Sequence, residues 1–61
     1  KNINKILNLG YSFIAFTDNK ILDSKGKEIK LFDENIKHVS MINNNLLFII
    51  LENNLQLFTI K

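Results

Sequence analysis

Residues 14–21 of the chain read Ile-Ala-Phe-Thr-Asp-Asn-Lys-Ile, and residues 48–55 read Phe-Ile-Ile-Leu-Glu-Asn-Asn-Leu. The two stretches match in pattern at an offset of 34 (55 − 21). Upstream, Asn-Ile-x-x-Ile at residues 2–6 returns as Asn-Ile-x-x-Val at residues 35–39, at an offset of 33 (36 − 3). A fixed period of roughly 20–50 residues is typical of arrays whose unit cannot bury its apolar face alone. The sequence therefore predicts a repeat of about 33–34 residues, with a slip of one residue inside it.

Length and composition limit what such a chain can do alone. Its 61 residues make one small domain, close to the size at which a single core is marginal. There is no Cys, so neither a disulfide nor a thiolate metal site can stabilise it. Hydrophobic residues nevertheless make up 46% of the chain. This surplus predicts a protein partner, which could be further repeats, further copies or another chain, and we do not expect an isolated monomer.

Short apolar runs alternate with turn residues along the whole chain. The runs are rich in Ile, Leu, Val and Phe, and Asn, Asp and Gly dominate the breaks between them, a pattern typical of β-strands. The run at residues 46–51 has no polar alternation, which predicts a strand covered on both faces. The seven predicted strands are residues 3–9, 11–17, 20–23, 28–32, 36–42, 46–51 and 55–60.

Two stretches also fit a helix. Residues 3–7 carry an apolar stripe closed by Gly10, and residues 46–57 could continue through their two Asn residues. The close spacing of turn signals leaves little room for helices of ordinary length, so an all-β fold is favoured. The strands then form two antiparallel meanders, a four-stranded repeat at residues 1–33 and an incomplete three-stranded repeat at residues 34–61. A four-stranded meander at this pitch is typical of a β-propeller blade, which gives about 1.75 blades.

The segment from Ile21 to Ile29 resembles a WD40 repeat where its third strand ends and its fourth begins. Leu22-Asp23 stands where that family has Trp-Asp, and Asp18 lies in the preceding turn, where the family keeps an Asp. The chain departs from the pattern because it has no Trp. It also resembles the repeat of the regulator of chromosome condensation at residues 36–58, and quinoprotein-type blades at residues 22–29. The resemblance implies a propeller scaffold for protein–protein interaction.

Residues for catalysis are scarce. His38 is the single His, on a predicted strand, and we interpret it as a surface residue. Most of the acidic residues stand beside Asn, Gly or Lys in turns, where solvation keeps carboxylates ordinary. The two Gly residues form no phosphate-binding loop. We therefore expect no enzyme, no metal site and no cofactor.

Loops carried by a rigid scaffold are the usual place for binding. The sequence analysis therefore nominates four polar loops as contact sites in a protein that we expect to be intracellular. These loops are Asp18-Asn19, Asp33-Glu34-Asn35, Asn43-Asn44-Asn45 and Glu52-Asn53-Asn54.

The last predicted strand is the second candidate contact. No fourth strand follows it in the second repeat, so it is expected to form an edge that pairs with a partner strand. It has no Pro, and Lys61 provides the charge protection. The contact residues would be Leu55, Leu57, Phe58 and Ile60.

A self-contained small β-barrel of the OB or Sm-like kind, binding single-stranded nucleic acid, is the alternative. Lysines with Tyr11 and the phenylalanines could form a basic, stacking groove. The absence of Arg speaks against base reading, so nucleic acid is the less favoured partner. A membrane span is not expected either, since the longest apolar run has six residues, at 46–51, against about 20 for a spanning helix.

Overall fold

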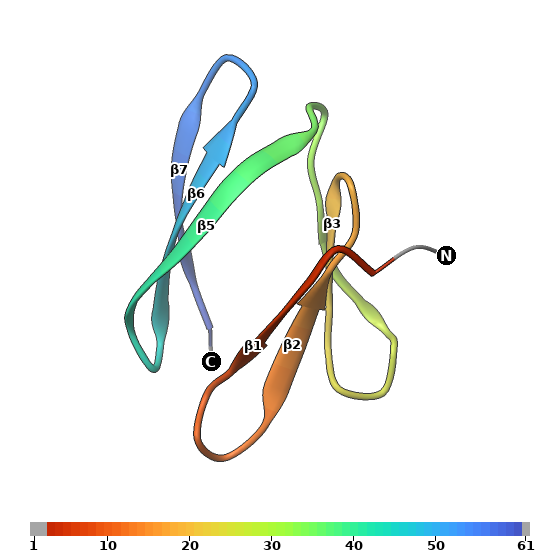
Figure 1. Ribbon diagram of the computed structural model, residues 1–61, viewed down its shortest axis with the longest axis vertical. Helices are drawn as coiled ribbons and strands as arrows, with labels where there is room; N and C mark the ends of the chain where they lie inside the picture. The colour runs from red at the N-terminus through yellow and green to blue at the C-terminus, as the bar shows by residue number, and fades with distance from the viewer. Residues whose placement is uncertain (1–2, 61) are drawn as a thin grey trace.

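Seven antiparallel strands form the computed structural model, which describes residues 3–60 (Figure 1). All seven lie where the sequence predicts them, and the helical alternatives are wrong, because the described residues contain no helix. The strands are β1 (Lys5–Asn8), β2 (Phe13–Phe16), β3 (Lys20–Leu22), β4 (Glu28–Leu31), β5 (Ile36–Asn43), β6 (Leu46–Leu51) and β7 (Leu55–Thr59). Within the same part of the chain no helix is long and apolar enough to cross a membrane.

The strands form two meanders, in which each strand pairs with the next along the chain. The first sheet has the order β1-β2-β3-β4 and the second β5-β6-β7, every pair being antiparallel. Figure 1 shows β6 and β7 on one side of the molecule, and β2 and β3 on the other. No ladder joins the two sheets, so residues 3–60 form no closed barrel.

An apolar layer between the sheets forms the core. Phe16, Ile21, Leu47 and Ile49 are each at most 1% exposed within it. Burial of such side chains stabilises the fold by roughly 1.5–3 kcal/mol each. The buried members of this core are Leu9, Ile14, Phe16, Ile21, Phe32, Val39, Leu47, Ile49 and Leu51, with Leu7, Ile36, Phe58 and Ile60 packed against them.

The hairpins of the two sheets repeat at the predicted offset. The Thr17 N–H donates to the Lys20 carbonyl over 3.0 Å in the β2–β3 turn. The Leu51 N–H donates to the Asn54 carbonyl over 2.8 Å in the β6–β7 turn. Both partners of the second bond follow those of the first at the offset of 34 (51 − 17 and 54 − 20). The turns are therefore equivalent in structure as well as in sequence.

A register shift in β5 explains the slip between the offsets of 33 and 34. Ile6 pairs with Ala15 in the first sheet, and Val39 pairs with Ile49 in the second. The partners on β2 and β6 stand at an offset of 34 (49 − 15), but those on β1 and β5 stand at an offset of 33 (39 − 6). The register of β5 against β6 shifts within residues 41–43. β5 therefore contains one extra residue between its pairing with β6 and the β5–β6 turn. This residue changes the offset from 33 to 34.

The first sheet packs through what we call the front face, the side that carries Leu7, Ile14, Phe16 and Ile21. Residues that pair directly, and alternate residues along a strand, share one face of a sheet. Its other side, the back face, carries Ile6, Phe13, Ala15 and Leu22, none of which belongs to the core between the sheets.

The second sheet packs through the opposite side. Its buried Leu47 and Ile49 are the equivalents, at the offset of 34, of Phe13 and Ala15 on the back face of the first sheet. We therefore call the packed side of the second sheet, with Val39, Leu47, Ile49, Leu51 and Phe58, its back face. Its front face, with Leu46, Phe48, Ile50, Leu55 and Leu57, points away from the first sheet. The two sheets thus pack front on back.

The expectation that β6 is covered on both faces is wrong for the described residues. Its side chains alternate strictly, with Leu47, Ile49 and Leu51 buried. Leu46, Phe48 and Ile50 are only half-buried, because no second layer lies over the front face. The apolar run of β6 therefore has one buried side and one partly open side.

The β3–β4 turn is held by one carboxylate and one glycine. Asp23 accepts hydrogen bonds over 2.9 Å from the backbone N–H groups of Lys25 and Lys27. Gly26 has a φ of 85°, in the left-handed region that favours glycine. The bond from Lys27 has the largest effect on the pKa of Asp23 and is opposed in part by burial. The bond from Lys25 and the charges of both lysines add to the lowering, so the pKa lies below its ordinary value of 3.8.

Asp23→Asn tests this turn, because Asn keeps an acceptor oxygen and removes the charge. The charged form of a carboxyl with a lowered pKa stabilises the fold above the ordinary pKa, and this contribution is lost as the pH falls through the lowered pKa. We expect the variant to unfold at a lower temperature than the wild type at neutral pH. The difference should begin to shrink as the pH falls below 3.8 and vanish below the lowered pKa, which thermal unfolding followed by circular dichroism measures. A constant difference at all pH values would contradict the role of the charge.

Ile49→Val tests the core between the sheets. Ile49 is 0% exposed, so loss of one methylene should lower the free energy of unfolding by about 0.5–1.5 kcal/mol. The matched control is Ile29→Val in β4, where the side chain is 43% exposed and the same change should have a smaller effect. Urea titration measures both, and an equal loss in the two variants would contradict the assigned core.

Candidate functional site

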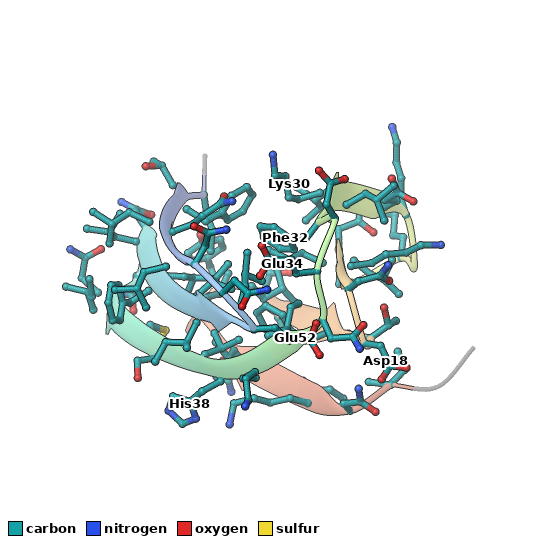
Figure 2. All side chains as sticks on the ribbon, turned by 90° about the horizontal axis from the view of Figure 1, so that it is seen from above. Asp18, Lys30, Phe32, Glu34, His38 and Glu52 are labelled. Atoms are coloured by element: carbon teal, nitrogen blue, oxygen red, sulfur yellow. The ribbon has the colours of Figure 1, made fainter. Side chains whose placement is uncertain are left out.

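Three of the four nominated loops meet at one end of the molecule. The linker that joins the sheets brings them together, because the Ile36 N–H donates to the Asp18 carbonyl over 2.7 Å. On its other side, Glu34 accepts from the Asn53 N–H over 2.6 Å and from the Asn54 side-chain amide over 2.7 Å. These loops lie at the top of Figure 1, and Figure 2 looks down on them. We call this surface, formed by Asp18, Asn19, Asp33, Glu34, Asn35, Glu52, Asn53 and Asn54, the loop end.

The loop end holds four of the six acidic residues of the chain. Two of their carboxylates serve the fold: Glu34 clamps the β6–β7 turn, and Asp18 accepts from the Asn4 side-chain amide over 2.7 Å. Asp33 and Glu52 are exposed and accept no side-chain bond from the described residues. These two carboxylates are therefore the ones open to a partner.

A hollow of about 170 Å³ opens at the loop end between the linker and the second sheet. The Lys30 ammonium lies 5.7 Å from the centre of the Phe32 ring there, a cation–π distance. Phe32 is buried while Asp33 is exposed, so the open lining of the hollow is mainly polar. Figure 2 shows Lys30, Phe32 and Glu34 in this region. Its lining is Lys30, Leu31, Phe32, Asp33, Glu34, Leu51, Asn54 and Gln56.

The fourth nominated loop, Asn43-Asn44-Asn45, lies at the opposite end of the molecule. There the Tyr11 hydroxyl donates to the Asn44 carbonyl over 3.4 Å, and the Asn45 N–H donates to the Asn43 side chain over 2.8 Å. The first bond links the β1–β2 turn of the first sheet to the β5–β6 turn of the second. This loop therefore contacts the first sheet at the lower end of the molecule and is separate from the loop end.

The nominated edge residues divide between two sides of β7. β7 is the edge strand of its sheet, as predicted. Leu55 and Leu57, 60% and 62% exposed, belong to the front face. Phe58 and Ile60 are half-buried and pack against the core. A charged substitution at Phe58 would disturb the core as well as the edge, so the front-face leucines are the cleaner probes.

The chemistry-bearing side chains form no further centre in the described residues. His38 is exposed on β5, well apart from the labelled acids in Figure 2. No group of three or more His, Asp and Glu residues within 3–60 could hold a metal ion. Among the aromatic residues, Phe16 and Phe32 are buried, whereas Tyr11 and Phe13 are exposed. The aromatic side chains of the described residues therefore do not make one open stacking surface.

Sequence reasoning missed two features of the loop end. It nominated Glu34 as a binding residue, but this side chain spans the linker and the β6–β7 turn, 19 residues away. It also missed Lys30 and Phe32, whose spacing by two positions on one strand was the available signal. Comparison with protein-family models, curated protein sequences and solved structures gives no match to this chain.

Glu34→Gln tests the clamp. Gln offers one acceptor oxygen where the carboxylate offers two, so one of the two bonds is lost and the other loses its charge. We expect the free energy of unfolding to fall by about 0.5–1.5 kcal/mol. The Asn53 amide should also exchange its hydrogen faster, which nuclear magnetic resonance detects. Asp33→Asn is the matched control, and equal exchange at Asn53 in both variants would contradict the clamp.

Proposed function

We propose that this chain is part of a β-propeller-like array that serves as a rigid scaffold for protein–protein interaction. The observation that carries the proposal is the head-to-tail packing of two meanders related by the repeat at offsets of 33 and 34. Arrays of this kind present the loops of successive repeats side by side on one surface. WD40-type propellers are the class that the Leu22-Asp23 segment resembles.

The loop end is the proposed contact surface. Its loops are tied together through the linker, so a partner would meet a preformed surface, and little ordering would be needed on binding. Asp33 and Glu52 expose carboxylates there, and a hollow of about 170 Å³ lies beside Asp33. This combination suits a protein segment that carries Lys or Arg, since complementary charges favour encounter and register.

Peptides selected from a random displayed library against the immobilised chain would test this surface. We expect the selected peptides to be enriched in Lys and Arg. Their affinity, measured by fluorescence anisotropy, should fall about two- to thirtyfold in the double variant Asp33→Asn/Glu52→Gln. The magnitude follows because each exposed charge pair contributes about 0.2–1 kcal/mol.

The matched control is Ser24→Lys/Asn44→Lys, which changes the net charge by the same two units but on turns away from the loop end. A general charge effect would weaken binding equally in both double variants and would contradict the assigned surface. A parallel titration with a labelled single-stranded oligonucleotide at low salt tests the alternative class. Tight, salt-sensitive binding of the oligonucleotide would favour the nucleic-acid function over the scaffold.

A further inference from the structure

The front face of the second sheet is an apolar surface that the fold leaves without a covering layer. Phe48 pairs directly with Leu57, and Ile50 with Leu55, so these four side chains form one continuous patch across β6 and β7. Leu46 extends the patch on β6. None of these five side chains carries a charge, and Leu55 and Leu57 are the most exposed of them. Contiguous apolar patches of this kind mark interaction sites in soluble proteins.

The back face of the first sheet is also apolar and uncovered. Ile6, Ala15 and Leu22 lie in one row across β1, β2 and β3. The open area comes from Ile6, which is 59% exposed, and from Phe13 beside it, which is 42% exposed, whereas Ala15 and Leu22 lie low in the sheet. At the margin of this face, the Lys20 ammonium and the Glu28 carboxylate pair over 3.8 Å, so their charges compensate each other there.

These two uncovered faces are the same two kinds of face that already pack against each other inside the chain. The internal interface joins Ile14, Phe16 and Ile21, on a front face, to the back face of the next sheet. Their equivalents at the offset of 34 are Phe48, Ile50 and Leu55 on the uncovered front face. The buried Leu47 and Ile49 have Phe13 and Ala15 as their equivalents on the uncovered back face. Each molecule therefore has one uncovered front face and one uncovered back face, the two kinds of surface that form its internal interface.

We infer that the front face of the second sheet binds the back face of the first sheet of a second copy of this chain. The contact continues the internal stacking from one molecule to the next. It is heterologous, because each molecule contributes a different surface to it. The second copy is the occupant because its back face presents Ile6, Phe13 and Ala15, the equivalents of Val39, Leu47 and Ile49 in the internal interface.

The backbone at the open end supports the same direction of stacking. The Asp18 carbonyl accepts the Ile36 N–H where the linker enters the second sheet. Glu52 is the equivalent of Asp18 at the offset of 34 (52 − 18). Ile3 is the equivalent of Ile36 at the offset of 33 (36 − 3). The Ile3 N–H of the incoming copy would thus reach the Glu52 carbonyl, which accepts no such linker bond within residues 3–60.

Two blocking variants and their mixture test the inference. Leu57→Glu places a charge on the front face, and Ile6→Glu places one on the back face, both at exposed positions where the isolated fold should tolerate it. Light scattering and sedimentation should show the wild type at multiples of 7.1 kDa. Each variant alone should be a monomer. An equimolar mixture should form a 1:1 pair, because each variant keeps the face that the other lacks.

The control is Gln56→Glu, which adds the same charge to β7 beside Leu57 but on the opposite side, since Gln56 is exposed and pairs with Ile49, and it should assemble as the wild type does. Thermal unfolding confirms that each variant is folded, and Leu57→Gln with Ile6→Gln replaces any variant that is not. A monomeric wild type, or a mixture that fails to pair, would overturn the inference. So would assembly that survives Ile6→Glu but not Leu57→Glu, because that result describes a front-to-front dimer.

The inference rests on the proposed array, but it is tested at different residues from the loop end. A chain that stays monomeric and still selects peptides through Asp33 and Glu52 would overturn the assembly alone. A chain that assembles and shows no charge-dependent peptide binding would overturn the loop-end contact alone.

Discussion

The apolar layer between the two sheets is the contact on which the rest of this structure depends. A meander of three or four short strands buries one face only if something covers it, and neither sheet has a helix to do so within the described residues. Each sheet uses the other instead, and Phe16, Ile21, Leu47 and Ile49 lose nearly all exposure to water in the process. Each sheet therefore depends on the other for its stability.

The stacking also positions the polar features at the two ends. The linker must run from the end of β4 to the start of β5, and this brings Glu34 within reach of the β6–β7 turn. At the other end, the Tyr11 hydroxyl of the first sheet's β1–β2 turn reaches the Asn44 carbonyl in the second sheet. These bonds are individually modest because they are exposed. Their effect is to hold the orientation that the apolar layer has already selected.

Packing front on back has a consequence that packing front on front would not have. Two equivalent faces packed together would close the structure, as in a symmetric dimer. Here the faces are different, so the molecule ends in a back face on one side and a front face on the other. Apolar side chains accordingly lie on both faces of the second sheet, with Ile49 on the covered face and Phe48 on the open one.

The sequence by itself determined the seven strands and the turns between them. These are local properties: a run of β-branched and aromatic residues favours extended backbone, and Asn, Asp or Gly ends it wherever the strand lies. Even the one-residue slip could be read from the offsets of 33 and 34. In the structure, this slip lies at the register shift in β5 within residues 41–43.

Only the tertiary structure decided which faces are covered and which loops meet. The uniform apolar run of β6 predicts two buried sides, but Phe48 is only half-buried while Ile49 is fully buried. The reason is that a face is buried only where another sheet lies on it. Leu57 and Phe58 are equally apolar in sequence, yet they lie on opposite sides of β7. Likewise, nothing local distinguishes Glu34 from Asp33. Its role as a clamp depends on a turn that stacking brings beside it from 19 residues away, and long-range proximity of this kind is set by packing instead of by propensity.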